Sequence, residues 1–301
     1  MIRSLDAATN RFLEHLRGLN SRLERAQREV AGGKRVAAPS DAPDRVVSLL
    51  GAKADLARLD QIQANLGRFK TEVDGAEGVL QQAVKLFDRV RTLGMTGASG
   101  IQTETTRRGI ADEIQSLIER MTGIANTQVD GRYIFAGNAD QTAPFLMDWS
   151  ATPPWGPYRG AAATREAIHP TGVTFRVSLD AEWIFANPNP RLNVLAGMET
   201  LRQALLSGDE QAMQSALAPL ADMAAHLNAA LMFYGNVQTQ IADGLETASA
   251  MKLRLQTQVA SIEDADLTES IVELQQVRFT QEAALQVRAA SPRRSLFDYL
   301  A

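Results

Sequence analysis

Residues 20–44, NSRLERAQREVAGGKRVAAPSDAPD, decide the predicted fold of this 301-residue chain. They read as the end of an amphipathic helix, a glycine stop at residues 32–33, a basic pair, and a turn restricted by Pro39 and Pro43. Glycine permits the left-handed conformation that ends helices, and Asp41 or the serine before it can cap the next helix. The stretch therefore predicts a short terminal helix joined to a longer helix by a constrained link.

Apolar residues repeat at alternating steps of mostly three and four on both sides of this stretch, the spacing of a coiled-coil seam. Before it lie Leu5, Phe12, Leu16, Leu19, Leu23, Ala26 and Val30; after it lie Leu59, Ile62, Leu66, Phe69, Val73, Ala76, Leu80, Ala83, Phe87 and Val90. The run GMTGASG at 94–100 predicts an interruption, and Thr103 can cap a third helix. Helical patterns return from residue 191, along 227–262 and again after a capping-box-like start at Asp266.

The middle of the chain has a different composition. Seven of the eleven prolines and all three tryptophans fall between residues 144 and 190, and proline is excluded from helix interiors. The run GRYIFAG at 131–137 and the alternation of apolar and polar residues over 173–179 are typical of strands. The insert is therefore predicted to be β-rich.

We predict a mainly α fold, a long antiparallel coiled-coil-like helical bundle built from both chain ends, with a β-hairpin and a small β-rich inserted domain. The predicted domains are three. Residues 1–35 with 264–301 form terminal helices, residues 36–145 with 186–263 form the long bundle, and residues 146–185 form the insert.

Composition excludes several classes of function. Lys and Arg number 31 against 35 Asp and Glu, a net charge of -4, so no overall basic field favours nucleic acid. The absence of cysteine removes disulfides and thiolate sites. The longest unbroken apolar run, 229–234, is far shorter than the roughly 20 residues that span a bilayer, so we expect no membrane insertion. No cleavable signal is visible after Met1.

No motif for catalysis, cofactor binding or metal binding stands out. The three histidines form no i,i+4 pair, and the chain contains no phosphate-binding glycine loop with its lysine. The carboxylates near residues 41–44 and 263–266 are explained by helix capping. We therefore expect no enzyme activity, no cofactor and no metal.

The central stretch resembles the N-terminal signature of the bacterial flagellin-like family, L-x-x-x-Q-x-x-x-(A/S)-x-G-K-R-V-x-x-P-S-D-x-P. The matching residues are Leu23, Gln27, Ala31, Gly33, Lys34, Arg35, Val36, Pro39, Ser40, Asp41 and Pro43, while Gly32 and Ala42 depart from the pattern. The run YIFAG at 133–137 and the ending SLFDYLA at 295–301 also resemble this family. The ending is similar to the branch that joins hook to filament and differs from the usual ending of flagellin.

The resemblance implies a structural subunit of the flagellum, an adapter that joins hook to filament and polymerises through its terminal helices. The implied partners are further copies of the chain in a helical or ring assembly, a hook-side associated protein, flagellin and a flagellar export chaperone. The implied location is extracellular, after export by the flagellar type III apparatus with an uncleaved N-terminus.

The terminal seams are the predicted assembly interface, because a lone pair of short helices buries little surface and is marginal in water. The predicted interface residues are Phe12, Leu16, Leu19, Leu23, Val30, Leu267, Ile271, Leu274, Leu285, Leu296, Phe297 and Leu300. Gly33, Pro39 and Pro43 are predicted to set the geometry of the link. We expect these helices to order on assembly.

Three alternatives stay open on the sequence alone. The first is a flagellin-type filament subunit. The second is a coiled-coil enzyme, for instance a cell-wall hydrolase, with its site in the insert; its candidate residues are Asp148, Glu166, His169, Asp180 and Glu182. The third is an export chaperone or membrane-surface adapter, which would need neither the PSD motif nor the aromatic insert; a basic amphipathic N-terminus such as residues 1–35 could lie on a membrane.

Overall fold

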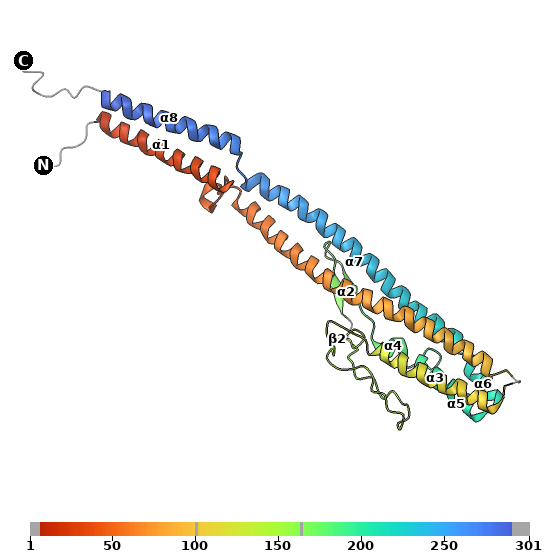
Figure 1. The fold of residues 1–301 in the computed structure, drawn as a ribbon. Helices are drawn as coiled ribbons and strands as arrows, with labels where there is room; N and C mark the ends of the chain where they lie inside the picture. The colour runs from red at the N-terminus through yellow and green to blue at the C-terminus, as the bar shows by residue number, and fades with distance from the viewer. Residues whose placement is uncertain (1–6, 100–101, 163–164, 291–301) are drawn as a thin grey trace, which may run out of the picture. The chain divides into compact units, whose positions relative to one another are not determined.

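The computed structural model describes residues 7–99, 102–162 and 165–290. The long helices are α1 (Ala7–Gly32), α2 (Val46–Gly97), α3 (Glu104–Ala125), α5 (Val194–Ser207), α7 (Leu220–Glu263) and α8 (Leu267–Ala290). Shorter elements are the 3-10 turn η1 (Pro39–Asp41) and the helices α4 (Ala181–Phe185) and α6 (Glu210–Leu217). Two antiparallel hairpins complete the fold, β1 (Gln128–Val129) with β2 (Arg132–Tyr133), and β3 (Glu166–Ile168) with β4 (Thr174–Arg176) (Figure 1).

The chain divides into two compact units, which we call the terminal unit (residues 1–58 and 251–301) and the central unit (residues 59–250). Both boundaries fall inside long helices, α2 and α7, and not at the turns where the three predicted domains meet. The division into three domains with the predicted bounds stays a prediction. The predicted mainly α bundle with a β-hairpin is confirmed.

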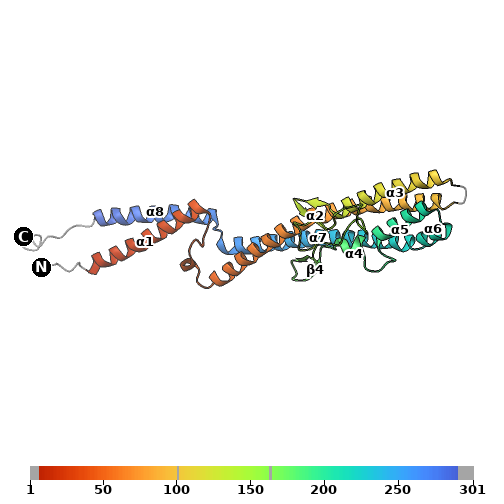
Figure 2. The same cartoon turned by 90° about the horizontal axis from the view of Figure 1, so that it is seen from below.

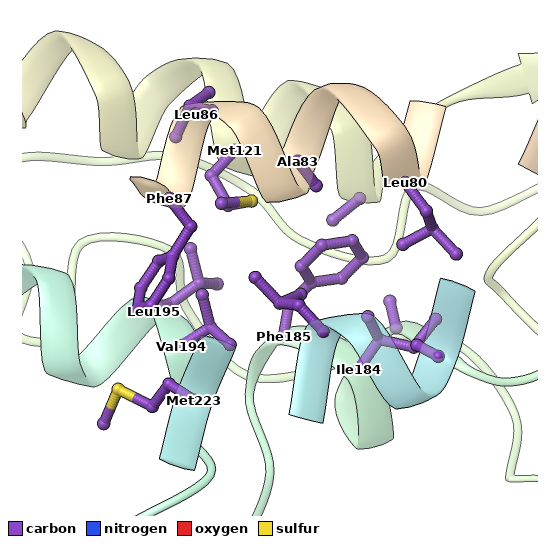
Figure 3. Close-up of a cluster of buried hydrophobic side chains, with 14 of the residues drawn as sticks. Leu80, Ala83, Leu86, Phe87, Met121, Ile184, Phe185, Val194, Leu195 and Met223 are labelled. Atoms are coloured by element: carbon purple, nitrogen blue, oxygen red, sulfur yellow. The ribbon is translucent and has the colours of Figure 1, made fainter. Parts of the chain in front are cut away.

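The core of the central unit is formed by the predicted seam of α2 together with α3, α5 and α7. Leu66, Leu80, Phe87 and Val90 on α2 are at most 1% exposed. Side chains from α2, α3, α4, α5 and α7 meet in this cluster (Figure 3). The three-and-four spacing thus correctly predicted which face of α2 is buried.

The glycine run after residue 93 does not end α2 at Gly94, because the helix continues to Gly97. A Cβ atom at Gly94 would lie 2.8 Å from the side chains of both Leu201 and Leu217. At Gly97 a Cβ atom would collide with the side chain of Leu205. These glycines allow α5 and the end of α6 to approach α2 closely. The predicted cap at Thr103 is present, since its hydroxyl accepts the N–H of Thr106 at 3.2 Å.

The segment predicted as a β-rich insert has little β structure. The β3–β4 hairpin pairs only three residues on each side, with Ala167 opposite Phe175, and much of the segment is irregular. Several of its apolar side chains are buried in the core of the central unit, among them Trp155, Val177, Ile184 and Phe185. The insert therefore contributes to that core.

Residues 210–263 contain a window of mean hydropathy 1.3 that is long and apolar enough to cross a membrane by length and composition. In the structure, Leu227, Ala230, Tyr234 and Ile241 of α7 are at most 1% exposed and belong to the central core. Packing inside the protein accounts for part of this apolar character, since 33% of the window is buried.

Candidate assembly interface

The two terminal helices α1 and α8 lie side by side in the terminal unit (Figures 1 and 2). Their contact buries Leu19 and Ala26 of α1 and Val277 of α8, which are 3%, 2% and 1% exposed. Ser270 is also buried, and its hydroxyl donates to the Glu29 carboxylate at 2.9 Å. The helices run antiparallel.

Polar contacts set the register of this pair along its length. Arg22 Nε donates to Glu273 Oε1 at 2.8 Å, and Gln281 Nε2 donates to Asn20 Oδ1 at 2.9 Å. Near the start of α1 and the end of α8, the Arg288 guanidinium lies 5.7 Å from the centre of the Phe12 ring. Because these groups are largely exposed, the ion pair between Arg22 and Glu273 contributes at most about 1 kcal/mol. The polar contacts therefore fix the alignment of the two helices more than they add to stability.

The predicted interface residues divide into two groups. On α1, Leu19 is buried, while Phe12, Leu16, Leu23 and Val30 are partly buried; Leu274 of α8 is partly buried as well. On α8, by contrast, Leu267, Ile271 and Leu285 are 48%, 43% and 48% exposed. The seam of α1 is thus largely covered within the chain, and α8 keeps part of its seam open. Leu296, Phe297 and Leu300 lie outside the described residues.

Sequence reasoning missed a second set of apolar side chains on α8. Val272, Phe279 and Val287 are 57%, 74% and 69% exposed. Val272 and Phe279 are seven residues apart, so they project from the same side of the helix two turns apart. A helix with apolar residues on more than one side is typical of elements that are buried on several sides. The seven-residue spacing of Val272 and Phe279 is the sequence signal for this second apolar side. It is not part of the single predicted seam of the helix.

We use the name α8 apolar surface for the exposed residues Leu267, Ile271, Val272, Phe279, Leu285 and Val287. Single exposed apolar residues are ordinary on protein surfaces, whereas a set of six on one helix indicates an interaction site. Aromatic side chains such as that of Phe279 are also enriched at the cores of interfaces.

The link after α1 folds back on the link between α7 and α8. Gly33 has a φ of +65°, the left-handed conformation that favours glycine. Its carbonyl accepts the N–H of Ala265 at 3.0 Å, and the Glu263 carbonyl accepts the N–H of Arg35 at 2.7 Å. Under this pairing, Val36, Leu49 and Ile262 form a small core.

A carboxylate between two lysines closes this link. The Glu263 side chain is 7% exposed, and its two oxygens lie 2.5 Å from Lys34 Nζ and 2.7 Å from Lys53 Nζ. The hydrogen bond from Lys34, followed by that from Lys53, lowers the pKa of Glu263, and the same contact with Glu263 raises the pKa of Lys34. Sequence reasoning had treated Glu263 as a helix cap. Asp266 is the residue that caps α8, accepting the N–H groups of Thr268 and Glu269.

Asp41 was predicted to cap the long helix α2, and it acts on the link instead. Its carboxylate accepts the backbone N–H groups of Ala37 at 3.1 Å and Ala38 at 2.7 Å. The bond from Ala38 is the main reason that the pKa of Asp41 is lowered. Pro39 begins the 3-10 turn that carries Asp41, and Pro43 follows as an exposed residue. Whether these two prolines set the angle of the link stays a prediction.

The candidate residues of the enzyme alternative have separate structural roles. Asp148 accepts the N–H of Ser150, Asp180 caps α4, and Glu166 lies in β3. His169 Nε2 is 3.4 Å from an Asp243 carboxylate oxygen on α7. Across residues 7–99, 102–162 and 165–290, no three metal-binding side chains gather.

Paired long helices with seams of apolar residues are typical of coiled-coil proteins, and an exposed apolar surface is typical of an interaction site. The chain is similar to the flagellin-like family: residues 4–140 match the family model described as the bacterial flagellin N-terminal helical region. This finding confirms the resemblance noted from the signature at residues 23–43.

Individual relatives agree with this assignment. Flagellar hook-associated protein 3 of Escherichia coli (strain K12) is 24% identical over 261 residues, covering 85% of this chain and 80% of the relative. Flagellin of Clostridium tyrobutyricum is 24% identical over 127 residues, covering 42% of this chain and 34% of the relative. A solved structure of a putative flagellar hook-associated protein from Vibrio parahaemolyticus superposes with a TM-score of 0.65 at 21% identity, over 74% of this chain and 100% of that one.

Proposed function

We propose that this chain is a non-enzymatic structural subunit of the bacterial flagellum that joins hook to filament. The proposal is supported by the similarity to hook-associated protein 3, which extends over most of both chains, whereas the similarity to flagellin extends over less than half of this one. Its partners would be further copies of itself, a hook-side associated protein, flagellin and an export chaperone. Its location would be extracellular, after export.

The observation that carries the proposal is the α8 apolar surface. Fully burying a side chain of this size contributes roughly 1.5–3 kcal/mol, and the six members of the surface are 43–74% exposed. Packing against neighbouring subunits would therefore recover several kilocalories per mole for each subunit. This gain can offset the conformational entropy that is lost when the subunit is fixed in an assembly.

The link supports the proposal because an adapter must hold its terminal helices in a defined direction. The backbone pairing around Gly33 and the Glu263 carboxylate between Lys34 and Lys53 constrain the chain where α1 ends and where α8 begins. In this proposal the terminal pair is the part that packs with other subunits, and the link transmits its orientation.

Immunogold labelling of purified flagella from the source bacterium tests this function. The proposal predicts gold at a single narrow zone between hook and filament, and filaments that detach from hooks when the gene is deleted. Label along the whole filament would favour the flagellin-type alternative. Normal, fully attached filaments in the deletion strain would contradict both functions.

A further inference from the structure

A cavity of about 660 Å³ lies in the central unit between the loop of residues 145–158 and the helices α4 and α5. Its volume is within the range of small-molecule sites, roughly 300–1,000 Å³. The assembly function described above makes no use of it. The side chains that line it determine what it can bind.

One wall of the cavity is a rigid stack of charged and aromatic groups. The Arg202 guanidinium lies 5.2 Å from the Trp149 ring centre and donates two hydrogen bonds of 2.8 Å to the Glu199 carboxylate. Trp149 Nε1 donates to Glu119 at 2.8 Å, and Gln203 donates to Glu199 at the same distance. Arg202 and Glu199 neutralise each other, and their paired geometry holds the wall in place before any ligand arrives.

Rings make up much of the remaining lining. Those of Pro153, Pro154, Trp155, Pro157 and Tyr158 line the cavity, and the aliphatic side chains around it are only alanines. A fatty ligand would therefore find little branched aliphatic surface to pack against. The aromatic rings can instead pack against a ligand that presents a C–H face.

Three of the remaining polar side chains have planar polar groups, and none of the three carries a positive charge. Glu182, Asn193 and Gln203 line the cavity, and a carboxylate or amide group can make two hydrogen bonds side by side. With Arg202 paired to Glu199, the one uncompensated charge is that of Glu182, which disfavours phosphates and other anions. A ligand with adjacent hydroxyl groups and no negative charge fits this arrangement.

We propose that this cavity is a binding site for a neutral oligosaccharide. A pyranose ring would stack its C–H face on the proline and aromatic rings, and its edge hydroxyls would bond to Glu182, Asn193 and Gln203. This proposal is independent of the flagellar function, since it concerns a different unit of the chain from the α8 apolar surface.

The test is isothermal titration calorimetry of the purified full-length protein with three neutral probes, cellotetraose, maltotetraose and chitotetraose. Thr200 lines the cavity and is exposed on α5, with its hydroxyl bonded to the Ala196 carbonyl. The substitution Thr200→Phe places a bulky side chain in the cavity and so obstructs it. Thr239→Phe is the matched control, because Thr239 is also exposed on a helix and bonds the carbonyl four residues earlier.

We expect at least one probe to bind, with the affinity reduced about tenfold or more by Thr200→Phe and unchanged by Thr239→Phe. If Thr200→Phe does not fold by circular dichroism, Glu182→Gln replaces it, with an expected loss of about threefold. Failure of all three probes to bind, or equal affinity in the cavity variant, overturns the proposal. Binding of a proline-rich peptide in their place would also overturn it and assign the site to a polypeptide.

Discussion

Phe279→Asp tests whether the α8 apolar surface packs with neighbouring subunits. Phe279 is 74% exposed in the isolated chain, so most of the roughly 1.5–3 kcal/mol from burying such a side chain is still to be gained. Losing about 1–2 kcal/mol of it at each contact would lower incorporation by a factor of roughly 5–30. The buried aspartate would add a further desolvation penalty. The isolated protein, in contrast, should change its unfolding free energy by no more than about 0.5 kcal/mol.

The assay has two parts, urea unfolding of the purified variant and immunoblots of purified flagella, with protein secreted into the medium measured alongside to separate export from assembly. Met232→Asp serves as the matched control, because Met232 is 63% exposed on α7 in the central unit. Normal incorporation of Phe279→Asp would refute the reasoning. Destabilisation of the isolated protein by more than about 1 kcal/mol would do so as well, since the side chain would then belong to the fold of the monomer.

Three further predictions concern stability, each measured on the purified chain. Gly33→Ala should lower the free energy of unfolding in urea by about 1–2 kcal/mol, because the φ of Gly33 is +65°. The control is Gly32→Ala, at the end of α1 with open space around it, which should be neutral or stabilising by up to about 1 kcal/mol. Equal effects of the two substitutions would contradict the role given to Gly33 in the link. Gly94→Ala should lower the free energy of unfolding by about 1–3 kcal/mol, because the added methyl group overpacks two leucine side chains. Gly67→Ala in the same helix should not destabilise the protein. A stabilising effect of Gly94→Ala would show that the leucines move aside. Glu263 has a lowered pKa, so its contribution to stability is present above its ordinary pKa and is lost as pH falls through the lowered value. Glu263→Gln should therefore flatten the acid side of a plot of melting temperature against pH. An unchanged acid side would exclude the Glu263 ion pairs as the source of this pH dependence.

The buried faces of the long helices could be predicted from the sequence because they depend on local periodicity. The seam from Leu59 to Val90 is largely buried, and the caps at Thr103 and Asp266 accept the N–H groups expected of them. Both features are encoded within a few neighbouring residues. Tertiary packing reinforces these local preferences without reversing them.

Features that depend on distant residues could not be predicted in this way. The glycines at 94 and 97 read as a helix break, yet they make room for Leu201, Leu217 and Leu205 from more than 100 residues away. Likewise, the sequence near Glu263 gives no sign that Lys34 and Lys53 surround it. The insert forms the short β3–β4 hairpin, but its local sequence does not indicate that aromatic side chains such as Trp155 and Phe185 pack into the core of the central unit.

The candidate interface was predicted only in part for a related reason. A seam of apolar residues indicates that a helix packs on something, but not whether its partner lies in the same chain. For α1 the partner includes α8, which covers Leu19. For α8 the open side includes Phe279, which lies off the predicted seam.

Amide hydrogen exchange on the isolated protein and on assembled flagella tests the central claim most directly. In the isolated chain, α1 and α8 form a small pair and should exchange much faster than the buried segments of α2, α3 and α7 in the central unit. In assembled flagella, peptides covering α1 and α8 should become strongly protected while the central core changes little. Equal protection of α8 in both states would contradict the claim that the terminal pair is the assembly interface.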